Sequence, residues 1–221
     1  MKKALLLLSS LLLVLGSYSQ TLSKSLPLLK TGWSRIYIKD VGSYDLPPTM
    51  EVQKGRYKEF NDNAKKIYGF DATQITAQQK GLNELEEKGF EKYARVMIKT
   101  DIGAVGDYEK LSFNICEFTK ADILEMNNIF KQQIRQGFLG TGLRLTEWYP
   151  IKIEKVNGMS CIRISYKRQL NDNPFVLVNM YIFHNNDRMH TFTLSYRLSE
   201  ANFWKSDFAT ILNSFRISNI R

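Results

Sequence analysis

Hydrophobic and polar residues alternate along most of segment 143–196, as they do in β-strands that bury one face. The alternation is clearest over 161–169, and the pair Asn157-Gly158 in front of it is typical of a tight hairpin turn. Segment 175–183 (FVLVNMYIF) is almost continuously hydrophobic, which is typical of a strand inside a sheet. This part of the chain is therefore predicted to form several strands joined by short turns.

Shorter alternating segments come earlier in the chain. Strands are predicted at 35–39, 75–79 and 93–99, and the odd-numbered residues of the last strand are expected on one face. Gly42-Ser43 is predicted as a turn that leads into a second short strand. Pro47-Pro48 stands at the start of that second strand. Because proline cannot donate to a β-ladder, the strand is expected either to lie at a sheet edge or to start with the prolines outside the ladder.

Three segments have the periodicity of amphipathic helices. Residues 57–68 repeat hydrophobic positions at offsets of three and four, which predicts a short helix. Thr119 and Asp122 form a predicted N-cap pair for a longer helix with one apolar stripe. Segment 199–215 is predicted to be a closing helix that Ser199 caps and that returns onto the sheet.

Two loop segments are less decisive. Segment 82–91 (LNELEEKGFE) fits a helical turn or an exposed loop. Segment 102–107 (IGAVGD) has two glycines after a strand, but their spacing matches neither a dinucleotide-binding nor a Walker loop. We interpret it as a hairpin tip.

These elements predict an α+β fold. It consists of an antiparallel sheet of about six or more strands, with two longer helices and one shorter helix packed on its faces.

The N-terminus resembles a secretory signal peptide. Lys2 and Lys3 precede the apolar run 4–15, and small residues lead to an expected cleavage after Ser19. The run is shorter than the roughly 20 residues needed to span a bilayer, and no later segment is predicted to be transmembrane. We therefore expect a signal peptide at 1–19, a tether at 20–32 and a single α+β domain at 33–221, exported to the periplasm or the extracellular space.

Charge and cysteine content narrow the chemistry. The formal net charge is +9, or +7 without Lys2 and Lys3, but the basic residues are dispersed, so nucleic acid is not an expected partner. Export permits Cys116 and Cys161 to form a disulfide, although two buried thiols fit the pattern as well. No spacing of residues indicates a catalytic group, a metal site or a cofactor.

The binding candidates are aromatic, basic and imidazole side chains in the strand-rich region. Adjacent aromatic residues could line a ligand pocket or belong to the core, and nearby basic residues on one strand could bind a small anion or remain solvated. The candidate residues are Trp148, Tyr149, Arg163, Lys167, Arg168, His184 and His190.

The relation between His184 and His190 depends on the register of the turn between them. A turn over 185–188 pairs His184 with Met189 and places His190 on the opposite face, whereas a three-residue turn makes the histidines diagonal neighbours. His190 is expected on the face that also carries Phe192, Leu194 and Tyr196.

The order of these elements resembles the PsbP-like family. The resemblance covers residues 33–217 and rests on the segments YDLPPTMEV, FLGTGL, TFTLSY and NFWKSDFATILNSFRI. It implies an α/β/α sandwich, a fold that a Ran-binding nuclear-transport factor also represents. The family's better-known members are non-catalytic accessory or binding proteins.

The leading hypothesis is an exported, non-catalytic binding or assembly protein whose partner is an unknown protein or a small anionic ligand. Two alternatives remain open. One is a metal-dependent or acid/base hydrolase that uses His184 and His190, and the other is a small-ligand carrier with a pocket between sheet and helix.

Overall fold

The computed structural model describes residues 28–55, 57–59, 62–63, 75–109, 111, 117–218 and 220–221. The predicted signal peptide and most of the predicted tether lie outside them, so both stay predictions. Of the predicted helix at 57–68, residues 57–59 and 62–63 are helical, and the others lie outside the described residues.

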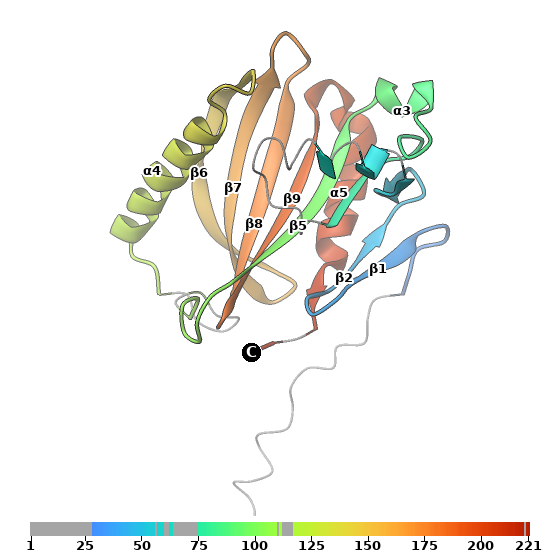
Figure 1. Ribbon diagram of the computed structural model, residues 1–221. Coiled ribbons are helices and arrows are strands. Elements are labelled where there is room, and N and C mark those ends of the chain that lie inside the picture. The colour runs from blue at the N-terminus through green and yellow to red at the C-terminus, as the bar shows by residue number, and fades with distance from the viewer. Residues whose placement is uncertain are drawn as a thin grey trace, which may run out of the picture.

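A seven-stranded sheet forms the centre of the molecule, and every neighbouring pair in it is antiparallel (Figure 1). In spatial order its strands are β3 (Met50–Val52), β4 (Ile75–Gln79), β5 (Ala94–Ile102), β9 (Arg188–Arg197), β8 (Val176–Asn185), β7 (Met159–Leu170) and β6 (Leu143–Val156). A separate three-stranded sheet has the order β1 (Ser34–Ile38), β2 (Gly42–Leu46) and β10 (Arg216–Ile217).

Helices cover the two faces of the large sheet. Helix α4 (Lys120–Gly137) packs its stripe of Ile123, Met126, Phe130 and Ile134 on one face, which we call the α4 face. Helix α5 (Ala201–Ser214) buries its own stripe against the opposite face, the α5 face, together with the small sheet. Figure 1 shows α4 beside β6 and α5 across the sheet from it. The predicted α+β class, with helices on both faces of an antiparallel sheet, is therefore confirmed.

Local interactions explain why α4 begins where it does. The Thr119 hydroxyl accepts a hydrogen bond from the Asp122 backbone N–H, and the Asp122 carboxylate accepts one from the Thr119 backbone N–H. This reciprocal capping box satisfies two backbone donors at the helix start. The predicted N-cap pair is confirmed.

The start of α5 differs from the prediction. Leu198–Glu200 form a 3-10 turn, and Glu200 occupies the N-cap position without a side-chain cap hydrogen bond. Ser199 therefore does not cap the helix. The Glu200 carboxylate instead accepts hydrogen bonds from the Tyr93 backbone N–H and the Trp204 indole, which tie the start of α5 to β5.

The predicted turn at Gly42-Ser43 is wrong. These residues belong to β2, and the chain reverses over 39–41, where Asp40 has a φ of 60°. Gly42 is required in β2 because a Cβ there would lie 1.8 Å from the carbonyl oxygen of Arg216 in β10. Pro47-Pro48 lies outside the ladder, before the edge strand β3, as expected.

The structure defines both loop segments that the sequence pattern left undecided or suggested as a hairpin tip. Segment 82–91 contains a turn followed by the short helix α3 (Glu87–Glu91). Segment 102–107 is not a hairpin tip, because the neighbours of β5 are β4 and β9. The segment lies against the β8–β9 turn instead: the Gly103 N–H donates to Asp187 O at 2.8 Å, and just after the segment the Tyr108 N–H donates to Asn186 O at 2.9 Å.

Candidate functional site

The register of the β8–β9 hairpin separates the two histidines. Phe183 lies opposite His190 and His184 lies opposite Met189, with the turn over 185–188. Because opposed residues share a face and successive residues alternate, His184 lies on the α4 face and His190 on the α5 face. This register does not bring both histidines into one metal or acid/base site.

Each histidine has an enclosed environment of its own. The ring of His184 lies 5.5 Å from that of Tyr108, and burial lowers the pKa of His184. His190 is completely buried, with Nδ1 2.9 Å from Oγ1 of Thr100. Burial, assisted by the positive charge of Arg188, lowers the pKa of His190 to about 4. Both imidazoles are therefore neutral at pH 7.

The three predicted basic residues of β7 do not form one site. Arg163 and Lys167 lie on the α5 face, where each has an acidic partner in β6. Arg163 Nη1 is 3.5 Å from Glu154 Oε2, and Lys167 Nζ is 2.5 Å from Glu147 Oε2. Arg168 lies on the α4 face because strand residues alternate.

Arg168 belongs to an arginine–tyrosine cluster, which we define as Tyr57, Gln79, Tyr93, Arg95 and Arg168. Nη2 of Arg168 donates to the Tyr93 hydroxyl at 2.8 Å. Arg95 lies over the Tyr93 ring, with 5.0 Å between its Cζ and the ring centroid. Arg95 also donates to Gln79 Oε1 at 2.6 Å and to the Tyr57 hydroxyl at 2.9 Å.

Among the residues that the structure describes, the positive charge of this cluster has no acidic counterpart. Among the described residues, no ion pair includes Arg95 or Arg168. Burial by itself raises the pKa of the Tyr93 phenol, but the charges of Arg168 and Arg95 outweigh burial and lower it below its ordinary value. The cluster is therefore an electropositive site whose polar partners are neutral.

Sequence reasoning missed Tyr93 and Arg95 as site residues. The predicted strand 93–99 placed both residues on one face, although β5 itself begins one residue after Tyr93. Their meeting with Arg168 depends on strand order, because β9 and β8 lie between β5 and β7. No local sequence pattern specifies that order.

The aromatic pair Trp148 and Tyr149 is divided between the faces of β6. Trp148 stacks on Tyr166 at 6.2 Å between centroids and donates from Nε1 to Asn127 Oδ1 of α4 at 2.9 Å. Tyr149 lies on the other face, with Lys167 Nζ 5.8 Å from its ring centroid. The two rings therefore do not line a common pocket, and Trp148 packs with the core beneath α4.

Cys161 is a buried free thiol, and Cys116 lies outside the described residues, so the disulfide stays a prediction. Burial raises the pKa of the Cys161 thiol to about 12. In the part of the chain that the structure describes, no three His, Cys, Asp or Glu side chains converge to hold a metal ion. None of the helices described is long and apolar enough to cross a membrane.

Comparison with solved structures identifies a PsbP-like fold. The solution structure of cyanobacterial PsbP (CyanoP) from Synechocystis sp. PCC 6803 is similar with a TM-score of 0.51 at 14% identity, over 86% of this chain and 95% of that one. No family model and no curated protein matches the chain.

Two further structures are similar at TM-scores below 0.5. A protein of unknown function from Pseudomonas aeruginosa has a TM-score of 0.38 at 8% identity, over 83% of this chain and 96% of that one. A protein from Bacteroides thetaiotaomicron has a TM-score of 0.39 at 8% identity, over 76% of this chain and 43% of that one.

Proposed function

We propose that this chain is an exported, non-catalytic binding protein that recognises an anionic ligand through the arginine–tyrosine cluster. One observation carries the proposal: the guanidinium groups of Arg95 and Arg168 meet around Tyr93 without a carboxylate partner among the described residues. Partly buried cations are normally paired with acidic groups, since a desolvated charge is costly. An anionic ligand would supply the missing charge.

The two arginines have different roles in this proposal. Arg95 is held in place by Gln79 and Tyr57, so it contributes a fixed positive charge. Arg168 bonds only to Tyr93 among the described residues, which leaves most of its five N–H donors free. A planar guanidinium binds two oxygens of a carboxylate or phosphate at once, so Arg168 is the direct ligand-binding residue.

Export is the second part of the proposal. It rests on the leader-like sequence at 1–19, with its basic flank, apolar run and small residues. The likeness to CyanoP concerns the fold alone, and a fold does not determine function. The proposed binding role therefore rests on the arginine–tyrosine cluster.

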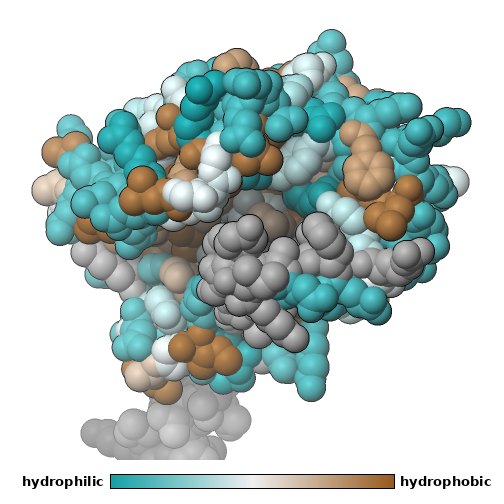
Figure 2. Space-filling model, turned by 45° about the horizontal axis from the view of Figure 1, so that its top comes forward, coloured by the Kyte–Doolittle hydropathy of each residue, from teal (hydrophilic) through white to brown (hydrophobic). Residues whose placement is uncertain are grey.

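The surface shown in Figure 2 favours binding of a ligand or partner through polar and charged contacts. Outside the part of the view that grey atoms cover, hydrophobic side chains appear in separate spots among hydrophilic ones rather than as one continuous area. A protein partner that docks by the hydrophobic effect needs a larger continuous apolar patch. Charge recognition is thus the better-supported mode of binding on that side.

The hydrolase alternative has less support. It requires His184 and His190 to act together, but they lie on opposite faces of the sheet. Acid/base catalysis also favours a pKa near the working pH, whereas burial lowers the pKa of both imidazoles.

Calorimetric titration of the purified protein with citrate and with inorganic phosphate tests the proposal. We expect saturable binding that weakens at higher salt and falls about tenfold or more in Arg168→Gln, in line with the loss of a charge-assisted bidentate contact. Arg144→Gln is the matched control, because Arg144 bonds to Gln169 on the α5 face.

Equal weakening in the Arg144→Gln and Arg168→Gln proteins would show a general effect of net charge and would contradict the proposed site. Absence of binding to both anions, and of any acidic ligand that co-purifies in native mass spectrometry, would also contradict it. Localisation of the protein in the cytoplasmic fraction of its own cells would refute export.

A further inference from the structure

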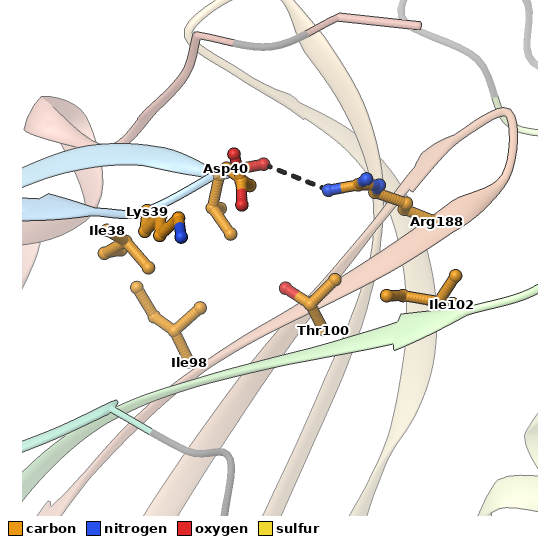
Figure 3. A pocket seen from close by; sticks show the side chains of 8 residues that line it. Ile38, Lys39, Asp40, Ile98, Thr100, Ile102 and Arg188 are labelled. Atoms are coloured by element: carbon orange, nitrogen blue, oxygen red, sulfur yellow. Dashed lines mark hydrogen bonds between the residues drawn. The ribbon is translucent and has the colours of Figure 1, made fainter.

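A cavity of about 240 Å³ lies on the α5 face, beneath the β1–β2 turn (Figure 3). It is next to the end of β5 and the start of β9, whereas the arginine–tyrosine cluster is next to the start of β5. Residues 38–41 of the turn form one wall, and Ile98, Thr100 and Ile102 of β5 form another. Arg188 of β9 extends along the edge of the cavity toward the turn. The cavity therefore joins apolar walls to the guanidinium group of Arg188.

The guanidinium of Arg188 lacks good acceptors. Its side chain is only 15% exposed, and its sole hydrogen bond among the described residues is a long one of 3.5 Å, from Nη1 to the Asp40 carbonyl oxygen. Nε is buried and has no hydrogen-bond partner in the described part of the chain. The Asp187 oxygen nearest to Nε is 3.7 Å away, while the other Asp187 oxygen accepts from Arg221 at 3.0 Å.

An enclosed guanidinium with unmet N–H groups is costly, since each donor has lost water without gaining a full replacement. Lys39 adds a second positive charge at the cavity, and the exposed Asp40 carboxylate opposes it from the turn. A carboxylate ligand fits the unmet donors of Arg188 because its two oxygens match the guanidinium fork.

Thr100 provides a second polar contact. Its Oγ1 lies 2.9 Å from Nδ1 of His190, which is completely buried beneath it. Nε2 of His190 is buried without a partner, and the neutral ring carries one proton. A proton on Nδ1 donates to Oγ1 and avoids a buried, unpaired N–H. The Thr100 hydroxyl is then free to donate into the cavity.

The remaining lining is aliphatic. Ile38, Val41 and Ile98 are buried members of the core and present methyl groups to the cavity. The volume corresponds to roughly eight water molecules at about 30 Å³ each, enough for an acid with a short branched chain. Apolar walls with a few convergent polar groups are the usual form of a small-molecule site.

We propose that this cavity is a second binding site and that it takes a short-chain aliphatic carboxylate. The carboxylate bonds to the Arg188 guanidinium and the Thr100 hydroxyl, and the aliphatic chain packs against Ile38, Val41 and Ile98. The site shares no residue with the arginine–tyrosine cluster and lies on the opposite face of the sheet. A test of this second site is therefore independent of the test of the proposed function.

The test is a titration of the ¹⁵N-labelled protein with 3-methylbutanoate at pH 7, followed by amide chemical shifts. We expect saturable shifts centred on Asp40, Thr100 and Arg188, with a Kd on the order of 0.1–1 mM for so small a ligand. The neutral probe 3-methylbutan-1-ol, which keeps the chain, and acetate, which lacks it, should each bind at least about fivefold more weakly.

Variants assign the contacts. Arg188→Gln should weaken binding about tenfold or more, and Arg188→Lys should restore only part of it, because lysine lacks the fork. Thr100→Val should weaken binding about threefold, whereas Arg144→Gln, outside the cavity, should leave it unchanged. Each variant's thermal midpoint is measured, and 3-methylbutanoate should raise that of the unaltered protein but not that of Arg188→Gln.

Three results would overturn the proposal. One is equal binding of the acid and the alcohol, which would leave no role for Arg188. Another is binding that Arg168→Gln abolishes and Arg188→Gln does not, which would place the ligand at the arginine–tyrosine cluster. The last is an absence of saturable shifts at the cavity in the folded, unaltered protein.

Discussion

The hydroxyl of Tyr93 accepts a 2.8 Å hydrogen bond from Nη2 of Arg168, a residue 75 positions later in the chain. The contact spans the α4 face from the residue directly before β5 to β7, over two intervening strands. It places a phenol between two guanidinium groups, since Arg95 lies over the same ring. This contact defines the candidate site, and the ionisation of Tyr93 reports on it.

The first prediction concerns ionisation of Tyr93. Because Arg168 and Arg95 stabilise the phenolate, Tyr93 should ionise below the ordinary pKa of tyrosine, whereas burial raises the pKa of Tyr166 and of Tyr181 to about 12. An ultraviolet titration of the folded protein should show one early phenolate. Arg168→Gln should move that transition to higher pH, and Tyr93→Phe should remove it. An early transition that persists in Tyr93→Phe would assign it to another residue.

The second prediction concerns stability in mild acid. His190 has a native pKa of about 4, below its unfolded value of about 6.5, so the unfolded chain binds the proton more readily. The free energy of unfolding should therefore fall as the pH drops from about 6.5 toward 4, by up to about 3 kcal/mol in total. His184, whose pKa is also lowered, contributes with the same sign.

Denaturant unfolding at pH 7, 6 and 5 measures this slope, and the native pKa of each histidine follows from the shift of its ring protons by NMR. The interval above pH 5 limits interference from carboxylates. A His190 ring that titrates near 6.5 in the folded protein would disprove the prediction.

The third prediction concerns Gly42. Alanine there should destabilise the protein by roughly 2–3 kcal/mol, because its Cβ would overlap the backbone of Arg216 and separate β2 from β10. Gly137→Ala is the control, since a Cβ at that helical position meets nothing within 4 Å and alanine favours helix. Urea unfolding should rank Gly137→Ala at or above the unaltered protein. Equal stability of the two variants would refute the close approach.

The fourth prediction concerns the capping box of α4. Thr119→Ala should lower the free energy of unfolding by about 1 kcal/mol, because the Asp122 backbone N–H loses its acceptor. Thr119→Ser keeps the hydroxyl and should remain close to the unaltered protein. Urea midpoints compare the three proteins, and a loss as large in the serine variant as in the alanine variant would show that capping is not the cause.

Much of the fold was predictable from local pattern. Period-two alternation predicted that His190, Phe192 and Leu194 share one face of their strand. The structure confirms this, because all three are buried on the α5 face. The Thr119–Asp122 pair was also predictable, because a capping box needs only residues three apart. The prolines before β3 marked an edge strand, since an imino nitrogen cannot join a ladder.

Other features depended on contacts that no local pattern encodes. Gly42 looked like a turn residue, but its place in β2 reflects the close approach of β10 from the other end of the chain. The β8–β9 register was one of two open alternatives, and the structure has the one that separates His184 from His190.

For this protein the sequence by itself determined most of the element types and the faces of most strand residues, because helix and strand periods are properties of neighbouring residues. Only the tertiary structure decided which strands are adjacent. It separated Arg163 and Lys167 from Arg168, joined Arg168 to Tyr93 and Arg95, and enclosed Arg188 beneath the β1–β2 turn. The physical reason is that an alternating strand specifies which face it buries but not which partner lies beside it.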